Sequence, residues 1–99
     1  MKLIWTDESL KRLIEIEDFI AVDNPTRAED FIDFLINKAD LMPENPQMGR
    51  VVPEFSSPKI RELIVKNYRI VYRIRESIIE ILTVFEGHRL IRRDEINRD

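Results

Sequence analysis

The C-terminal half of the chain contains three β-favouring runs that follow one another almost without a break. They read KIRELIVK (59–66), YRIVYRIR (68–75) and IIEILTVFE (78–86), with one residue between the first two runs and two between the last two. Parallel neighbours need a long crossover, so connections this short force adjacent antiparallel strands. The sequence therefore predicts a three-stranded antiparallel β-meander.

The middle run also predicts what its two faces carry. Successive side chains of a strand point to opposite faces, so one face would be apolar and the other mostly basic. The apolar set is Tyr68, Ile70, Tyr72 and Ile74, and the opposite set is Arg69, Val71, Arg73 and Arg75. We expect helices to pack on the apolar face and the basic face to stay exposed.

The N-terminal half begins with a short β-favouring segment and a helix. Residues 2–6 include Ile4 and Trp5, and Thr6 and Asp7 are both good helix N-caps followed by acidic residues. From Asp7 to about Val22, apolar residues recur at spacings of three and four, which is typical of an amphipathic helix. A strand is therefore expected to lead directly into a helix.

A second helix is predicted to start at once. Asn24 is a favourable N-cap and Pro25 suits the first helical position, and the apolar period continues until near Pro43. So short a break makes the two helices an antiparallel hairpin. Residues 43–58 contain four prolines and predict an extended loop. The predicted fold class is α+β: a short N-terminal strand and a helical hairpin packed on the meander.

The charge is distributed unevenly along the chain. The net charge is -3, but residues 1–49 hold five Lys/Arg against eleven Asp/Glu, whereas residues 50–99 hold eleven against eight. Between Lys59 and Arg75 there are six basic residues and a single acid, Glu62. This cluster predicts a local field that attracts an anionic partner, although a solvated strand face gives the same pattern.

Composition excludes several classes of protein and site. The chain has no Cys and one His, so disulfides, thiolate sites and a His-built zinc site are excluded, and no Gly-rich phosphate loop or nucleophile motif occurs. We expect no cofactor and no metal. No apolar run approaches the roughly 18 residues of a membrane span, and the N-terminus does not resemble a signal peptide. A single cytoplasmic domain over 1–99 is expected.

The remaining chemistry is acid-base or electrostatic. Arginines can bind phosphate through two hydrogen bonds, and His88 can exchange a proton near neutral pH, so such a set could cleave RNA without a metal. The candidate residues are Glu54, Arg61, Arg69, Tyr72, Arg73, His88 and Arg89. The structural alternatives are that His88 and Arg89 merely follow a strand-ending glycine, and that Tyr72 belongs to the core.

Three stretches in their order resemble the RelE/ParE superfamily of bacterial type II toxins. They are IEDFIAVDNPTRAEDFIDFL, then PQMGRVVPEF with KIRELIVKNYRIVYRI, and finally IEILTVFEGHRLI. The resemblance covers nearly the whole chain. It implies the RelE/ParE toxin fold, a growth-inhibiting toxin of the plasmid-stabilisation type, and a cognate antitoxin that neutralises it.

The resemblance also implies two possible targets. RelE-like members cut messenger RNA on the ribosome, and Arg61 and Arg69 match basic strand positions of these enzymes, with His88 or Arg89 near the place of the terminal acid-base group. ParE-like members inhibit DNA gyrase by binding. This chain has no terminal Tyr and no lysine pair before the first meander strand, and its net charge suits ribosomal RNA poorly, which favours the ParE-like interpretation.

We therefore expect a gyrase-binding toxin that is not an enzyme, with a metal-independent, ribosome-dependent mRNA endoribonuclease as the alternative. A third alternative is a degenerate member that binds only its antitoxin. The antitoxin is expected to place apolar anchors along the groove of the helical hairpin and acids against the basic face. The expected partner-binding residues are Arg61, Arg69, Arg73, Arg75 and Arg89. A dimer of toxin-antitoxin pairs is implied by the resemblance only.

Overall fold

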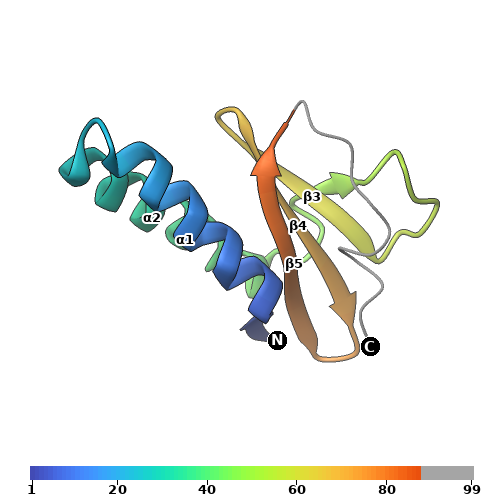
Figure 1. Cartoon of the computed structure of the whole chain (residues 1–99). Coiled ribbons are helices and arrows are strands. Elements are labelled where there is room, and N and C mark those ends of the chain that lie inside the picture. The colour runs from blue at the N-terminus through green and yellow to red at the C-terminus, as the bar shows by residue number, and fades with distance from the viewer. Residues whose placement is uncertain (88–99) are drawn as a thin grey trace.

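The computed structural model describes residues 1–87 as an α+β fold in which two helices pack on one five-stranded sheet (Figure 1). The elements are β1 (Lys2–Trp5), α1 (Asp7–Ala21), α2 (Pro25–Ala39), the 3-10 helix η1 (Met42–Glu44), β2 (Arg50–Val51), β3 (Ile60–Val65), β4 (Tyr68–Arg75) and β5 (Ile78–Glu86).

The sheet confirms the predicted meander and adds a strand at each side of it. The strand order is β1-β5-β4-β3-β2, with β1 parallel to β5 and the other neighbours antiparallel. The expectation of an extended loop without secondary structure over 43–58 is wrong, because the segment contains the short strand β2 and overlaps the end of η1. Elements of two or three residues are too short to show a hydrophobic period, so they could not be predicted within a proline-rich segment.

Both hairpins of the meander use tight two-residue connections. Val65 pairs with Tyr68 across the first turn, and Arg75 pairs with Ile78 across the second. The first residue of each turn adopts a positive φ, 56° at Lys66 and 55° at Glu76. Tight hairpins require such a backbone because it matches the twist of the strands. These turns fix the register of the sheet.

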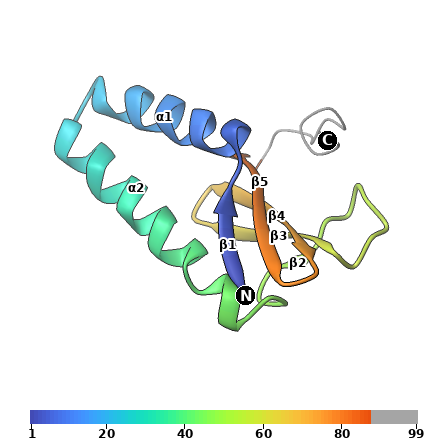
Figure 2. The ribbon, with the colours of Figure 1, turned by 90° about the horizontal axis from the view of Figure 1, so that it is seen from below.

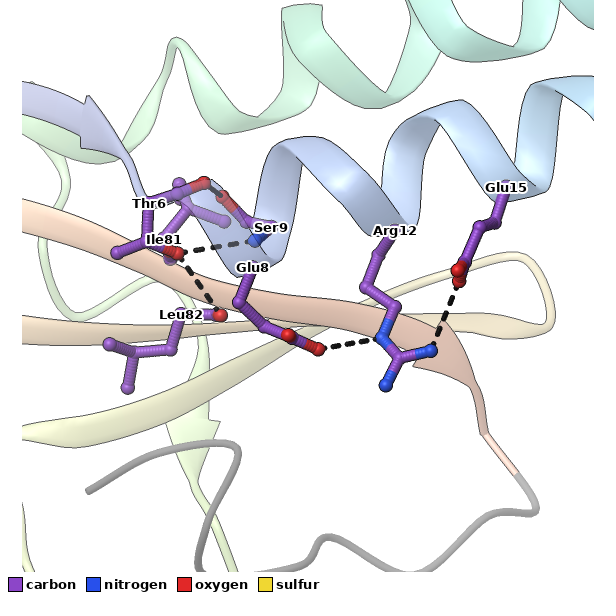
Figure 3. A network of polar contacts seen from close by, with 7 residues as sticks. All are labelled: Thr6, Glu8, Ser9, Arg12, Glu15, Ile81 and Leu82. Carbon is purple, nitrogen blue, oxygen red and sulfur yellow. Dashed lines mark hydrogen bonds and ion pairs between the residues drawn. The ribbon is translucent and has the colours of Figure 1, made fainter. Parts of the chain in front are cut away.

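Side-chain caps start both helices where the sequence predicted them. The Thr6 hydroxyl accepts a hydrogen bond from the Ser9 backbone N–H at 3.2 Å and donates to the Ile81 carbonyl at 2.7 Å, which ties the start of α1 to β5 (Figure 3). The Asn24 side-chain oxygen caps α2 by accepting from the Arg27 N–H at 3.1 Å. The bond from Thr6 to Ile81 thereby anchors the base of the helical hairpin to β5.

Apolar clusters lie on both faces of the sheet. Figures 1 and 2 show the helices against one face and the segment that joins β2 to β3 on the other side. The larger cluster lies between helices and sheet and includes Leu13, Leu35 and Tyr72. The smaller cluster lies on the opposite face and includes Val71, Leu82 and Phe85 of the sheet. Val52, from the segment between β2 and β3, is part of this cluster, and Phe55 packs against it. The second face of the sheet is therefore partly covered.

Candidate functional site

The centre of the predicted basic face is a buried ion-pair network. Arg69 is only 6% exposed, and its Nε donates to Glu62 Oε1 at 2.6 Å while its Nη2 lies 3.4 Å from a carboxylate oxygen of Glu54. The second oxygen of the fully buried Glu62 accepts from Arg50 Nε at 2.7 Å. The Arg69 guanidinium carbon also lies 5.2 Å from the centroid of the Phe85 ring. Arg69 is thus neutralised and stacked inside the protein.

The neighbouring arginines make further internal bonds. Arg61 donates to the Gly49 carbonyl at 2.9 Å and to the Pro58 carbonyl at 3.0 Å. These two bonds hold both ends of the segment 49–58, which covers part of the second face of the sheet. Arg73 pairs with Glu80 at 3.0 Å, and Arg75 reaches the same carboxylate at 3.4 Å.

Exposure separates these side chains. The Arg75 side chain is 54% exposed, whereas that of Arg73 is 19% exposed. The expectation of a solvent-exposed basic face is therefore wrong at Arg69 and holds best at Arg75. Alternation shows which face a residue occupies, but not whether a loop from elsewhere covers that face.

The other candidate residues fall into two groups. The core interpretation of Tyr72 is confirmed: its side chain is fully buried, and its hydroxyl donates to the Pro46 carbonyl at 2.7 Å and accepts from the Gly49 N–H at 2.9 Å. Burial raises the pKa of Tyr72 above its ordinary value, despite opposing effects of the Gly49 hydrogen bond and of Arg61. His88 and Arg89 lie outside the described residues.

The far ends of α1 and α2 diverge from the sheet (Figure 1). Two cavities lie on this side, between the helices and the residues where β4 begins and β5 ends. One cavity of about 460 Å³ is lined by Ile16 and Phe19 of α1 and by Tyr68, Val84 and Phe85 of the sheet, among others. A second, of about 490 Å³, shares Phe19 and Tyr68 and continues along α2. We call the two together the hairpin groove.

Aromatic residues give the hairpin groove its apolar character. Phe19 is 73% exposed, although it lies beside the buried stripe of α1. Phe31 of α2 contacts Tyr68 with ring centroids 5.3 Å apart, which joins the two sides of the groove. An exposed aromatic side chain in an apolar hollow is typical of a protein interface. The sequence predicted a groove here, but its apolar period did not distinguish the exposed Phe19 from the buried residues of the same helix.

Charged residues of both signs form the rim of the groove. Arg12 donates to Glu8 at 2.7 Å and to Glu15 at 3.1 Å (Figure 3). Burial lowers the pKa of Arg12, but the bonds to these two carboxylates outweigh it and raise that pKa overall. Burial, with a smaller effect of the nearby Glu86, raises the pKa of Tyr68. Tyr68 therefore keeps its phenolic proton at neutral pH.

Residues 1–87 lack two other kinds of feature. No group of three or more acidic or histidine side chains there is placed to hold a metal ion. No helix in the same range has the length and apolarity needed to cross a membrane.

The fold matches that of a known toxin-antitoxin structure. The structure titled "Chromosomal ParDE TA system from P. aeruginosa" superposes with a TM-score of 0.73 at 20% identity, covering 87% of this chain and 95% of that chain. The likeness places the chain in the α+β fold class of the RelE/ParE toxins.

Sequence comparison then gives the family. A family model described as "ParE toxin of type II toxin-antitoxin system, parDE" matches residues 3–91. "Putative toxin Y4kP" of Sinorhizobium fredii is 35% identical over 88% of each chain, and "Toxin RelE2" of Caulobacter vibrioides is 29% identical over 90% of this chain and 98% of its own. The chain belongs to the ParE family of type II toxins, and a cognate antitoxin is its partner.

Proposed function

We propose that this toxin inhibits DNA gyrase by binding to it, without cleaving RNA, and that its antitoxin binds in the hairpin groove. The observation that carries the first part is the ion pair between Arg69 and Glu62. Arg69 matches a basic strand position of RelE-like enzymes, yet here it is buried against two carboxylates and an aromatic ring.

RNA cleavage without a metal requires arginines that point at the scissile phosphate. Their charge must be free to stabilise the negative charge that develops in the transition state. Glu62 and Glu54 already neutralise Arg69, and Arg61 donates to two loop carbonyls. Withdrawing Arg69 to bind phosphate would leave Glu62 buried with only Arg50 as a partner. Removing one of its two arginine partners from a buried carboxylate is costly, which favours a binding mechanism.

The alternative function is a RelE-like, ribosome-dependent mRNA endoribonuclease. The similarity to "Toxin RelE2" of Caulobacter vibrioides supports this alternative. His88 or Arg89 would then serve as the acid-base group, and Arg75 is the most exposed of the strand arginines Arg61, Arg69, Arg73 and Arg75. Among the residues expected to bind partners, Arg73, Arg75 and Arg89 stay candidates for contact, whereas Arg61 and Arg69 act chiefly inside the fold.

The hairpin groove fits an amphipathic helix of the antitoxin. Its floor is apolar and aromatic, and its rim offers both charges for hydrogen bonds. Helices that dock in such grooves insert apolar anchors at helical spacing, and rim charges select the partner. Phe19 is the most exposed of the large apolar side chains that line the groove, so a helix covering the groove would bury it.

Expression of the toxin from a tightly controlled promoter tests the proposed target. DNA breaks and supercoiling should be followed in parallel with mapped mRNA cleavage on ribosomes. We expect DNA damage first, and inhibition of purified gyrase by the purified toxin in the absence of ribosomes. A His88→Ala/Arg89→Ala variant should stay toxic, as should its control Arg92→Ala/Arg93→Ala. Prompt mRNA cleavage that disappears only in the first variant would establish the nuclease instead.

A further inference from the structure

Two apolar side chains of α1 belong neither to the core nor to the hairpin groove. Leu10 is 45% exposed and Ile14 is 57% exposed, although both fit the apolar period of the helix. They lie four residues apart, so they are neighbours on one side of α1. Neither residue lines the two cavities of the groove. The helical hairpin therefore has an apolar pair on a second surface, which packs against nothing within residues 1–87.

Carboxylates surround this apolar pair. Asp7 lies three residues before Leu10 and Asp18 lies four residues after Ile14, so both are neighbours of the pair along the helix. Further acids that line neither cavity of the groove follow one another at helical spacings along α2, namely Glu29, Asp33 and Asp40. All five carboxylate residues are exposed, and none forms an ion pair within residues 1–87. We call these acids, together with Leu10 and Ile14, the outer face.

Basic residues do little to offset these acids. The two described helices contain four basic residues, Lys11, Arg12, Arg27 and Lys38. The last three line cavities on the sheet side of the hairpin, and Arg12 is already bonded to Glu8 and Glu15. Lys11 is left as the one base beside five carboxylates. The outer face is therefore strongly negative around an apolar centre.

This combination of charge and apolarity decides which partner fits. A second copy of this chain would bring the same acids into a two-fold contact, and their mutual repulsion opposes such a dimer. A basic surface would instead attract the carboxylates, while an apolar patch at its centre could cover Leu10 and Ile14. Proteins that hold DNA carry basic surfaces, because lysine and arginine neutralise the phosphates.

We propose that the outer face is the surface with which the toxin contacts gyrase. Leu10 and Ile14 act as apolar anchors, and the surrounding carboxylates pair with lysines and arginines of a DNA-binding surface. The proposal rests on the proposed function in taking gyrase as the target. It gives the acidic first half of the chain a role, and it separates the surface for the target from the hairpin groove for the antitoxin.

Biolayer interferometry with purified gyrase holoenzyme and the whole toxin tests both contributions. Leu10→Gln/Ile14→Gln should raise Kd at least about tenfold, chiefly through faster dissociation. A triple variant that neutralises the acids of α2, Glu29→Gln/Asp33→Asn/Asp40→Asn, should slow association at least about threefold at roughly 0.05 M salt, and the difference should disappear at roughly 0.5 M salt. Short-chain polyphosphate, which offers negative charge without bases, should compete with the wild-type toxin for gyrase.

Matched controls use side chains elsewhere on the surface. Leu41→Gln/Ile64→Gln replaces apolar side chains that are 48% and 49% exposed, and Glu44→Gln/Glu76→Gln removes two exposed acids. Both controls should bind gyrase as the wild type does. Circular dichroism should show all variants folded, because exposed substitutions change stability little.

The outcomes separate this proposal from the proposed function. If the wild type binds gyrase and both outer-face variants bind equally well, or if the controls lose as much affinity as they do, the assignment of the outer face is wrong while gyrase remains the target. Unchanged binding in excess polyphosphate would also overturn it. A wild-type toxin that neither binds nor inhibits gyrase would refute the proposed function, and the assignment with it.

Discussion

Replacement of Glu62 by Gln should destabilise the toxin strongly. Each carboxylate oxygen of Glu62 accepts from a different arginine, Arg69 on one side and Arg50 on the other. Gln supplies a single acceptor, so its NH2 group would face a guanidinium, and Arg69 would stay buried without its main countercharge. Loss of one partner of a buried ion pair costs about 3–5 kcal/mol.

The structure favours the lower end of that range. Glu54, whose side chain is 27% exposed, stays near Arg69 and can take over part of the pairing. We therefore expect Glu62→Gln to lower the free energy of unfolding by about 3 kcal/mol, out of a total of roughly 5–15 kcal/mol for a domain of this size. At about 4–8 °C per kcal/mol, Tm should fall by at least about 12 °C.

Urea denaturation followed by circular dichroism measures the effect. The matched control is Glu80→Gln, because Glu80 also pairs with two arginines but is 20% exposed, and its loss should cost about 1 kcal/mol or less. A Glu62→Leu/Arg69→Met variant removes both buried charges and should recover most of the loss. The reasoning is refuted if the two Gln variants lose equal stability, or if the double variant is as unstable as Glu62→Gln.

Three further changes test other parts of the structure. Tyr72→Phe removes the hydrogen bonds to Gly49 and Pro46 and should lower the free energy of unfolding, measured in urea, by about 1–2 kcal/mol. Because burial raises the pKa of Tyr72 in the folded protein, this phenol ionises first in the unfolded chain. The wild type should therefore lose stability above about pH 10 more steeply than the variant. Gly49→Ala should cost about 1–3 kcal/mol in the same assay, since its Cβ would lie 2.6 Å from a backbone oxygen. Phe19→Ser should change stability by under about 0.5 kcal/mol yet weaken binding of the co-expressed antitoxin at least tenfold by calorimetry, unlike Val22→Ser, at a residue 84% exposed outside the groove.

Local signals were sufficient to predict the meander and the helical hairpin. Strand-like runs separated by one or two residues allow only antiparallel pairing. Thr6 and Asn24 are favourable N-caps that stand directly before an apolar helical period, and each caps a helix in the structure. The N-terminal strand was predicted too, but its parallel pairing with β5 was not. That contact joins residues at opposite ends of the sequence, and no local pattern encodes it.

The buried ion-pair network could not be predicted for a related reason. Alternation placed Arg69 on the face opposite the helices, which is correct. It gave no sign that Val52 and Phe55, in a proline-rich segment without period, would cover that face. In the sequence Glu62 differs from its neighbours only as the one acid in a basic stretch, although a single acid among arginines is also what a buried ion pair requires.

The ion pairs of Arg69 with Glu62 and Glu54 weaken the attraction of the arginine-rich strand β4 for acidic partners. Arginine suits buried pairs because its planar group makes several directed bonds, whereas lysine holds a strongly hydrated charge that is expensive to bury. In this toxin Arg61 and Arg69 fasten the loop and the sheet, while Lys38 and Lys66 lie at the surface beside the Phe34 ring and form no ion pair within residues 1–87. An acidic partner would therefore gain little from Arg69, whose charge is already compensated by Glu62 and Glu54.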